Sequence, residues 1–350
     1  MCTKSESFDD LNNIYGSKYE KSDNMFLNEN VINNSDNKKR KATINEESNK
    51  RLELQNIVKS YSGISRRGYA PSYPCKKNQD SLIMLEHEES KSLIFACMDG
   101  HGEFGDLVSQ YMKKRLEALL FDHALFITDI KSAISEVVSN IEKELLDDQE
   151  LDTKLSGSTM VLAVIRGSHI TVANIGDSRI VLGTRDQHNN ISAKRLSVDH
   201  KPDSPNELKR IIESGGRVSA IEYEDGILGP SRVWLGNMKI PGLAMSRSLC
   251  DKVAHLAGVI STPDLFEYHL DNYSDLLLII ATDGLWEFMS DQDSISIASK
   301  CDKPADAVTK LISASNEKWL AKEQVVDDTT VCVIFLEAKV LYDKFIFKVP

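Results

Sequence analysis

The sequence contains no apolar run long enough to cross a membrane. A membrane-spanning helix needs about 20 consecutive, mostly apolar residues, and the apolar runs here have the length of strands. The first residues, MCTKSESFDD, have no apolar core and no glycine at position 2. We therefore expect neither a secretory signal nor a myristoylation site. These absences predict a soluble protein of the cytoplasm or nucleus, with no membrane partner.

Cysteine is sparse, and its spacing excludes two common uses. The cysteines stand at positions 2, 75, 97, 250, 301 and 332, and no two of them form a Cys-x-x-Cys pair. There is thus no zinc spacing and no disulfide framework, and reduced thiols are expected. Positive charge is also in deficit, because the formal net charge is −11. Such a chain is a poor match for a nucleic-acid backbone, so we expect no nucleic-acid partner.

Large apolar residues are scarce in the first part of the chain. Residues 1–50 contain ten asparagines together with charges of both signs. Such a segment buries too little apolar surface to offset its ordering entropy. We predict a disordered, Asn/Ser/Lys-rich tail at 1–55, one globular domain at 56–340 and a C-terminal extension at 341–350.

In the domain, β-branched apolar runs alternate with amphipathic segments. Strands are predicted at 81–85, 92–98, 158–165, 169–175, 178–184, 276–282 and 329–336, and helices at 104–120, 128–146, 205–214, 292–299 and 304–320. The short spacers 166–168 and 176–177 predict hairpins. Because the strands pair through hairpins and the regular βα alternation of a parallel fold is lacking, the pattern indicates an α+β fold in layers. The Gly- and Pro-containing stretch 216–245 predicts a long irregular segment near a site.

Several acids stand at the ends of these apolar strands. Asp99 ends one run and Asp283 another, Asp80 begins a third, and Asp177 and Asp327 lie beside chain reversals. A single Asp-Gly is usually only a turn. If the strand ends converge, however, several like charges meet, which is costly unless a cation compensates. Mg²⁺ and Mn²⁺ prefer such oxygen ligands, and two ions together can activate a water toward phosphorus.

A glycine and a histidine follow the first of these acids. Gly100 allows a sharp turn, and its carbonyl is a candidate for a further ligand. His101 is suited to donate a proton to a leaving alkoxide. The alternative is a histidine that only hydrogen-bonds its loop. The surrounding glycines and acids favour the catalytic role.

A series of motifs resembles the PP2C-type (PPM family), metal-dependent Ser/Thr protein phosphatases. In order they are NQD (78–80), DGHG (99–102), SGSTMV (156–161), ANIGDSR (173–179), LSVDHKP (196–202), ESGGRV (213–218), GLAMSRSL (242–249), ATDGLW (281–286) and DDTT (327–330). The resemblance covers about residues 60–337. It implies a four-layer α-β-β-α sandwich of two antiparallel sheets flanked by helices. It also implies that a monomer hydrolyses phosphoserine and phosphothreonine in phosphorylated proteins with a water activated on a binuclear Mg²⁺ or Mn²⁺ centre.

The same resemblance assigns roles to residues. It implies that Asp99 bridges two ions, that His101 is the general acid, and that Asp177 belongs to a weaker third metal site. The implied metal-site residues are Asp80, Asp99, Gly100, Asp283, Asp327, Gln79 and Asp177.

Some positions depart from the family pattern. Gln79 replaces a glutamate, Glu287 replaces an aspartate, and Cys75 replaces a phosphate-binding arginine. Arg66 or Arg67 is a candidate for the missing positive charge. The departures leave two alternatives open. One is a catalytically weak or inactive pseudophosphatase that acts as a binding module, and the other is a hydrolase of a different phosphate ester.

Overall fold

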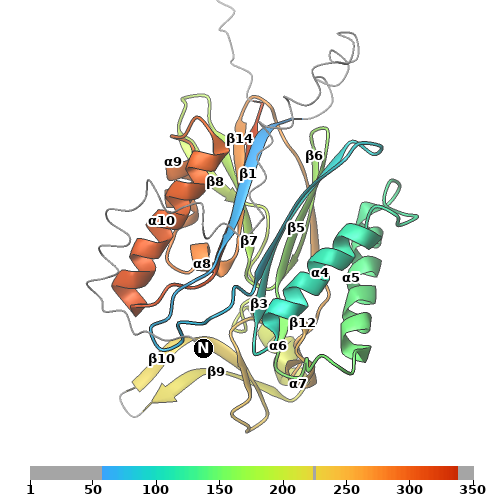
Figure 1. Ribbon diagram of the computed structural model, residues 1–350, viewed down its shortest axis with the longest axis vertical. Helices are drawn as coiled ribbons and strands as arrows, with labels where there is room; N and C mark the ends of the chain where they lie inside the picture. The colour runs from blue at the N-terminus through green and yellow to red at the C-terminus, as the bar shows by residue number, and fades with distance from the viewer. Residues whose placement is uncertain (1–56, 224–225, 338–350) are drawn as a thin grey trace, which may run out of the picture.

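The computed structural model describes residues 57–223 and 226–337. The tail predicted at 1–55 and the extension predicted at 341–350 lie outside these residues. Two antiparallel sheets pack face to face, and helices cover the outer side of each (Figure 1). This arrangement confirms the four-layer α-β-β-α sandwich. No helix within the two described ranges is both long and apolar enough to span a membrane.

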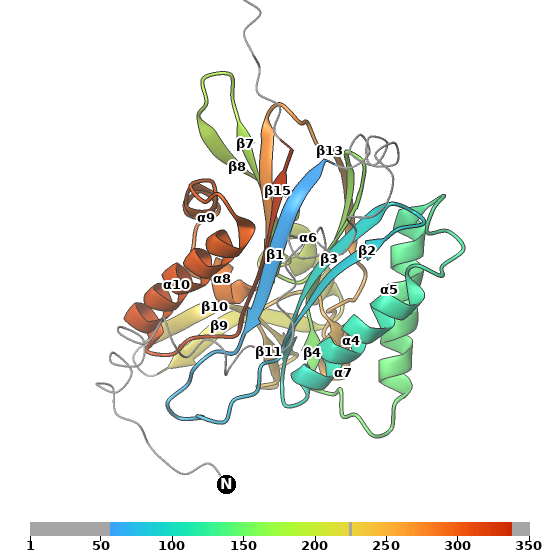
Figure 2. The ribbon, with the colours of Figure 1, turned by 45° about the horizontal axis from the view of Figure 1, so that its top comes forward.

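The first sheet contains five strands in the order β1-β15-β14-β7-β8. Their bounds are Val58–Arg66 for β1, Arg179–Arg185 for β7, Ile191–Arg195 for β8, Asp275–Ala281 for β14 and Thr329–Leu336 for β15. Helices α9 (Asp291–Ala298) and α10 (Pro304–Glu323) cover its outer face, and the short α8 (Asp283–Trp286) lies at one end (Figure 2). Because β14 and β15 are covered on both faces, their sequences are almost uniformly apolar.

The second sheet has the order β12-β4-β3-β5-β6-β13, and β2 also pairs with β3. Its strands are β2 (Asp80–His87), β3 (Ser92–His101), β4 (Gly157–Ser158), β5 (Met160–Arg166), β6 (His169–Ile175), β12 (Leu249–Cys250) and β13 (Asp264–His269). Helices α4 (Gly105–Leu119) and α5 (Ile130–Asp147) cover its outer face. Side chains of β3 alternate, so that Phe95 and Cys97 enter the core between the sheets while Ala96 and Met98 pack in the core that α4 and α5 share.

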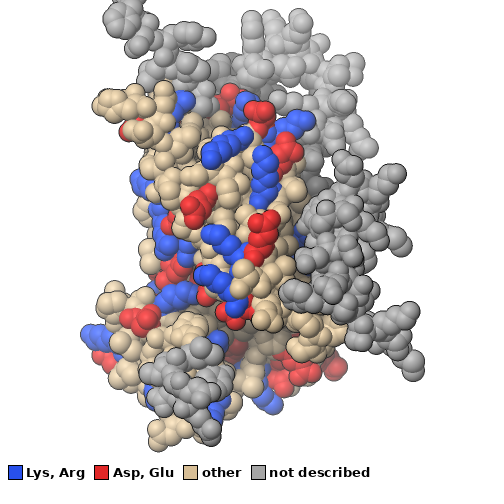
Figure 3. Space-filling model, turned by 90° about the vertical axis from the view of Figure 1, so that its left-hand side faces the viewer, with Lys and Arg blue, Asp and Glu red and all other residues tan. Residues whose placement is uncertain are grey.

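The outer face that carries α9 and α10 mixes both signs of charge. Lys and Arg side chains lie among Asp and Glu side chains across this face (Figure 3). The described side chains on this face therefore form no broad basic patch of the kind that a nucleic-acid backbone needs.

One of the two predicted hairpins is confirmed, and the other is wrong. Arg166 and His169 are register partners, so residues 166–168 do join two paired strands. Gly176 and Asp177, in contrast, connect β6 to β7, which belong to different sheets. This reversal carries the chain across the sandwich. Gly176 has a φ of 96°, and a Cβ there would lie 2.6 Å from Cγ2 of Thr159.

The prediction of an irregular segment at 216–245 is also wrong. This stretch forms an antiparallel sheet of β9 (Gly216–Tyr223), β10 (Gly226–Leu235) and β11 (Pro241–Leu243), which we call the flap sheet. Val233 packs in a small core with α6 (Pro205–Glu213) and α7 (Lys252–Leu256). Gly236, at a φ of 52°, lies in the turn between β10 and β11. Gly236 therefore marks a turn within a sheet and not an irregular segment.

Glu207 of α6 is a buried anion beside the flap sheet. Its carboxylate accepts hydrogen bonds from Arg210 at 2.8 and 2.9 Å, from Ser246 at 2.6 Å and from Arg247 at 2.8 Å. Burial alone would raise the pKa of Glu207, but these donors hold it well below the ordinary value of 4.5. The carboxylate thus joins α6 to the loop that follows the flap sheet.

We predict that Glu207→Gln lowers the free energy of unfolding by about 2–4 kcal/mol at pH 7, because two guanidinium groups lose their buried anion. Since the pKa is depressed in the folded state, the difference between wild type and variant should shrink as the pH falls below 4.5. Urea unfolding at pH 7 and pH 3 measures both effects.

Glu213→Gln on the same helix is the matched control, because the Glu213 side chain is 66% exposed. It should change stability by no more than about 0.5 kcal/mol. An equal loss in the two variants would contradict the role of Glu207.

Candidate active site

The acid-bearing ends of the strands lie together at the end of the sandwich next to the flap sheet (Figure 1). Asp80 and Asp99 are direct register partners on β2 and β3. The charge of Asp283 acts on Asp99, and Asp283 in turn interacts electrostatically with Asp177 and Asp327. The structure therefore brings together five of the acids that the sequence singled out.

Three of these acids, Asp80, Asp99 and Asp283, have a raised pKa. Burial is the larger cause and the charge of Asp283 the next, and together they raise the pKa of Asp99 well above its usual range. Burial and then Asp177 raise the pKa of Asp283 to about 7. Burial, as the larger cause, and the charge of Asp328 raise the pKa of Asp80. Crowded carboxyl groups at low dielectric retain protons until a cation compensates their charge.

Two lysines supply part of that compensation. The Nζ atom of Lys76 lies 2.8 Å from Oδ1 of Asp327 and 2.9 Å from Oδ2 of Asp328. The Nζ atom of Lys201 lies 2.6 Å from Oδ2 of Asp177. Burial lowers the pKa of both lysines, but the facing carboxylates raise it more, so both remain charged. The sequence analysis assigned neither lysine to the site.

The donor set of the site is made of oxygen atoms. Asp80, Asp177 and Asp283 each have a buried Oδ1 with no hydrogen-bond partner among the described residues. Buried polar atoms are normally satisfied, and carboxylate oxygens left unpaired are the ligands that Mg²⁺ and Mn²⁺ favour.

The donor chemistry thus fits hard divalent cations. Within residues 57–223 and 226–337, no three Asp, Glu, His or Cys side chains are already gathered closely enough to hold one. The present rotamers instead pair Asp327 and Asp177 with lysines.

Gly100 lies where only glycine fits. A Cβ at this position would lie 2.1 Å from the carbonyl oxygen of Gly105 and 2.6 Å from that of Gln79. The Gln79 carbonyl accepts the Gly100 N–H at 3.1 Å, and the Gln79 amide donates to the Gly102 carbonyl at 2.7 Å. Gln79 therefore ties the DGHG loop to β2.

His101 is held by an acid that sequence reasoning missed. Its Nε2 lies 2.6 Å from Oδ2 of Asp251, and the same oxygen accepts the Ser248 hydroxyl at 2.6 Å. The Nδ1 atom is buried without a hydrogen-bond partner in the described part of the chain. Burial alone would lower the pKa of His101, but Asp251 raises it above its usual value. The imidazole is thus held through Nε2, whereas Nδ1 has no hydrogen-bond partner among the described residues.

Arg66 and Arg67 lie at the rim, at the end of β1. Arg66 is the register partner of Thr329, and Nη1 of Arg67 donates to the Lys76 carbonyl at 3.5 Å. Lys76 directly follows Cys75, the exposed residue at the place of the family's arginine. Its ammonium group contacts acids of the site, whereas the described contacts of the two arginines are with the rim.

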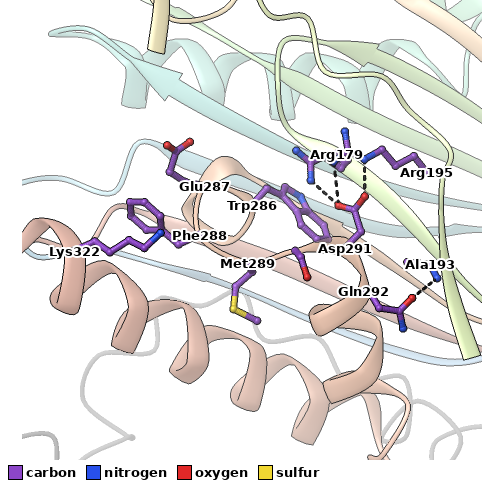
Figure 4. A pocket seen from close by; sticks show the side chains of 11 residues that line it. Arg179, Ala193, Arg195, Trp286, Glu287, Phe288, Met289, Asp291, Gln292 and Lys322 are labelled. Atoms are coloured by element: carbon purple, nitrogen blue, oxygen red, sulfur yellow. Dashed lines mark hydrogen bonds and ion pairs between the residues drawn. The ribbon is translucent and has the colours of Figure 1, made fainter. Parts of the chain in front are cut away.

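A pocket of about 580 Å³ lies on the outer side of α8 (Figure 4). Within it, Nη1 of Arg179 lies 2.6 Å from Oδ1 of Asp291, and Nε of Arg195 lies 2.5 Å from Oδ2 of the same residue. Arg179 therefore pairs with acids of the domain, Asp199 and Asp291. Glu287 also lines this pocket and points away from these ion pairs (Figure 4). It is exposed, in contrast to the buried Asp177.

Comparison with known proteins identifies the family of this chain. The family model described as protein phosphatase 2C matches residues 74–319. The probable protein phosphatase 2C 35 of Arabidopsis thaliana is 31% identical over 291 residues, which cover 78% of this chain and 83% of that relative. The probable protein phosphatase 2C 72 of the same plant is 34% identical over 276 residues, which cover 75% of this chain and 82% of that relative.

Solved structures show the same fold. The serine-threonine phosphatase 2C from Toxoplasma gondii has a TM-score of 0.69 at 21% identity, and the match covers 80% of this chain and 96% of that one. A sex determining protein of C. elegans has a TM-score of 0.63 at 20% identity, with 79% of this chain and 64% of that one covered. From the motif order and these matches, the chain belongs to the protein phosphatase 2C family and is an enzyme of the protein phosphatase class.

Proposed function

We propose that this protein hydrolyses phosphoserine and phosphothreonine in protein substrates with the help of two divalent cations, Mg²⁺ or Mn²⁺. The observation that carries the proposal is the buried acid cluster with its raised pKa values and unpaired oxygens. When bound, two such ions supply Lewis acidity and an activated water. The residues that would hold them are Asp80, Asp99, Gly100, Asp283 and Asp327, with Gln79 in support.

Charge balance supports two ions rather than three. Fully ionised, the five acids and Asp328, which contacts Lys76, carry six negative charges, and subtracting the two lysines Lys76 and Lys201 leaves four. Two divalent cations neutralise four charges. Lys201 already compensates Asp177, where the family resemblance implies a weaker third ion. Glu287, the other candidate ligand of that third ion, is exposed.

His101 and Asp251 provide the proton that the leaving group needs. Cleavage of the P–O bond leaves an alkoxide of serine or threonine, which is a poor leaving group until it is protonated. With Nε2 fixed on Asp251, the protonated imidazole donates from its open Nδ1 edge. Water supplies the new P–O bond, so the products are inorganic phosphate and the dephosphorylated side chain.

The first test is turnover of a phosphothreonine peptide with Mn²⁺ or Mg²⁺. We expect activity that EDTA abolishes, and a loss of at least about a hundredfold in Asp99→Asn, because a residue that would hold the ions loses its charge. The exposed Asp302→Asn is the matched control and should retain wild-type activity. If the wild type shows no turnover and calorimetry detects no Mn²⁺ binding, the pseudophosphatase alternative is correct. If small phosphate esters are hydrolysed and phosphopeptides are not, the other hydrolase alternative is correct.

The second test separates proton donation from general support of the fold. We expect Asp251→Asn to lower kcat for a phosphothreonine peptide by about 10²-fold or more, and His101→Ala to lower it at least as much. Turnover of p-nitrophenyl phosphate should fall much less, because its leaving group needs no proton. An equal fall for both substrates would show that Asp251 acts only structurally.

Lys76 is our candidate for the residue that binds the substrate phosphate. An ammonium group in contact with Asp327 stands beside the position that the reacting phosphate must approach. Lys76→Gln should raise KM for a phosphopeptide by about tenfold to a hundredfold, because a charge-assisted hydrogen bond is lost. Its neighbour Lys77→Gln is the matched control, since Lys77 is mostly exposed and pairs with Asp106 instead.

The same kinetics decide between Lys76 and the arginines. If KM rises for Arg66→Gln or Arg67→Gln and is unchanged for Lys76→Gln, the substrate phosphate is bound by an arginine at the rim and not by Lys76. The earlier prediction for these two arginines would then hold.

A further inference from the structure

Two histidines face each other at the end of the sandwich away from the flap sheet. His169 begins β6 beside the β5–β6 turn, and His269 ends β13. They are register partners in the antiparallel β6–β13 pair, and both side chains are exposed. Figures 1 and 2 place these strand ends at the opposite end from β9 and β10. The phosphatase chemistry makes no use of them.

The distance between their ring nitrogens matches a metal site better than a hydrogen bond. The two Nδ1 atoms lie 3.5 Å apart, and the ring centroids are 5.5 Å apart at an interplanar angle of 68°. An N–H···N contact of that length is weak, because good hydrogen bonds are about 2.7–3.2 Å. Two nitrogens that each bind one tetrahedral Zn²⁺ at about 2.0–2.1 Å are separated by about 3.4 Å.

A third polar atom lies beside the pair. The Ser168 hydroxyl oxygen is 3.4 Å from Nδ1 and 3.3 Å from Nε2 of His269. Neutral imidazole is the commonest protein ligand for late first-row divalent cations. Because these side chains are exposed, water can complete the coordination shell without further protein ligands.

We propose that His169 and His269 form a surface site for one late first-row divalent cation of the Zn²⁺, Ni²⁺ or Cu²⁺ class. The site is distinct from the carboxylate cluster, whose oxygen atoms select harder ions. β13 is the edge strand of its sheet, and this pair is the last register position of its ladder. A bound cation cross-links the edge strand to β6 and favours the folded chain in proportion to its occupancy.

The test uses the full chain with excess Mg²⁺, which occupies the carboxylate cluster and is silent in electron paramagnetic resonance. One equivalent of Cu²⁺ is added, because Cu²⁺ binds most tightly in this series. The wild type should bind Cu²⁺ with a spectrum that shows coupling to two imidazole nitrogens. His169→Ala and His269→Ala should each show one nitrogen and weaken binding by at least about tenfold, since even the loss of an outer-shell partner costs that much.

His188→Ala is the matched control, because His188 is an exposed histidine in the β7–β8 turn. It should bind Cu²⁺ as the wild type does. Urea unfolding of the metal-free variants checks that they fold, and no change is expected because the side chains are exposed. The proposal is overturned if the double variant His169→Ala/His269→Ala binds Cu²⁺ as tightly as the wild type, or if the wild-type spectrum shows one nitrogen. Both outcomes are independent of whether phosphopeptides are hydrolysed.

Discussion

Buried and half-buried carboxyl groups repel one another at the site, and the surrounding structure must offset that cost. The strands hold Asp80 and Asp99 as register partners, so their backbones stay side by side as long as the ladder is intact. Hydrogen bonds relieve part of the cost. The Thr282 hydroxyl donates to Asp80 at 2.8 Å, and the backbone N–H groups of Gly68 and Gln79 donate to Asp328 at 2.7 and 2.9 Å. The remaining cost is a local instability of the kind that active sites commonly carry.

The two sheets supply the stability that this arrangement requires. Fully buried apolar side chains of β3, β5, β14 and β15 fill the space between and outside the sheets. Tyr61 illustrates the packing, because its ring meets Phe95 edge to face at 4.9 Å while its hydroxyl donates to Glu86 at 2.9 Å. Rigid packing of this kind holds the strand ends, and hence the acids, in a fixed relation. The packing of the apolar runs thus holds in place the acids that end them.

The sequence predicted what depends on local pattern and missed what depends on distant contacts. Apolar runs such as 276–282 and 329–336 identified β14 and β15 because strands buried on both faces have no polar alternation. Gly176 and Asp177 read as a hairpin because a short turn has the same composition whether it joins neighbouring strands or crosses between sheets. The flap sheet was missed because its turn glycines, such as Gly236, are also typical of an irregular segment. Asp251 follows the GLAMSRSL motif, but nothing local showed its contact with a histidine 150 positions away.

Lys76 and Lys201 offset part of the negative charge of the site when no ion is bound. Lys76 lies 2.8 Å from Asp327, so an ion that takes this carboxylate must compete with an ion pair already formed. This ion pair lowers the net affinity of the site for the ion, but it also stabilises the folded site when no ion is bound. On the proposed function, Asp327 would help to hold an ion, and the Lys76 ammonium group, no longer needed by that carboxylate, would lie beside the reaction centre. A phosphate dianion is the natural partner for that group, because it brings back the negative charge that the ion has taken. Metal binding and substrate binding would then be coupled through one side chain.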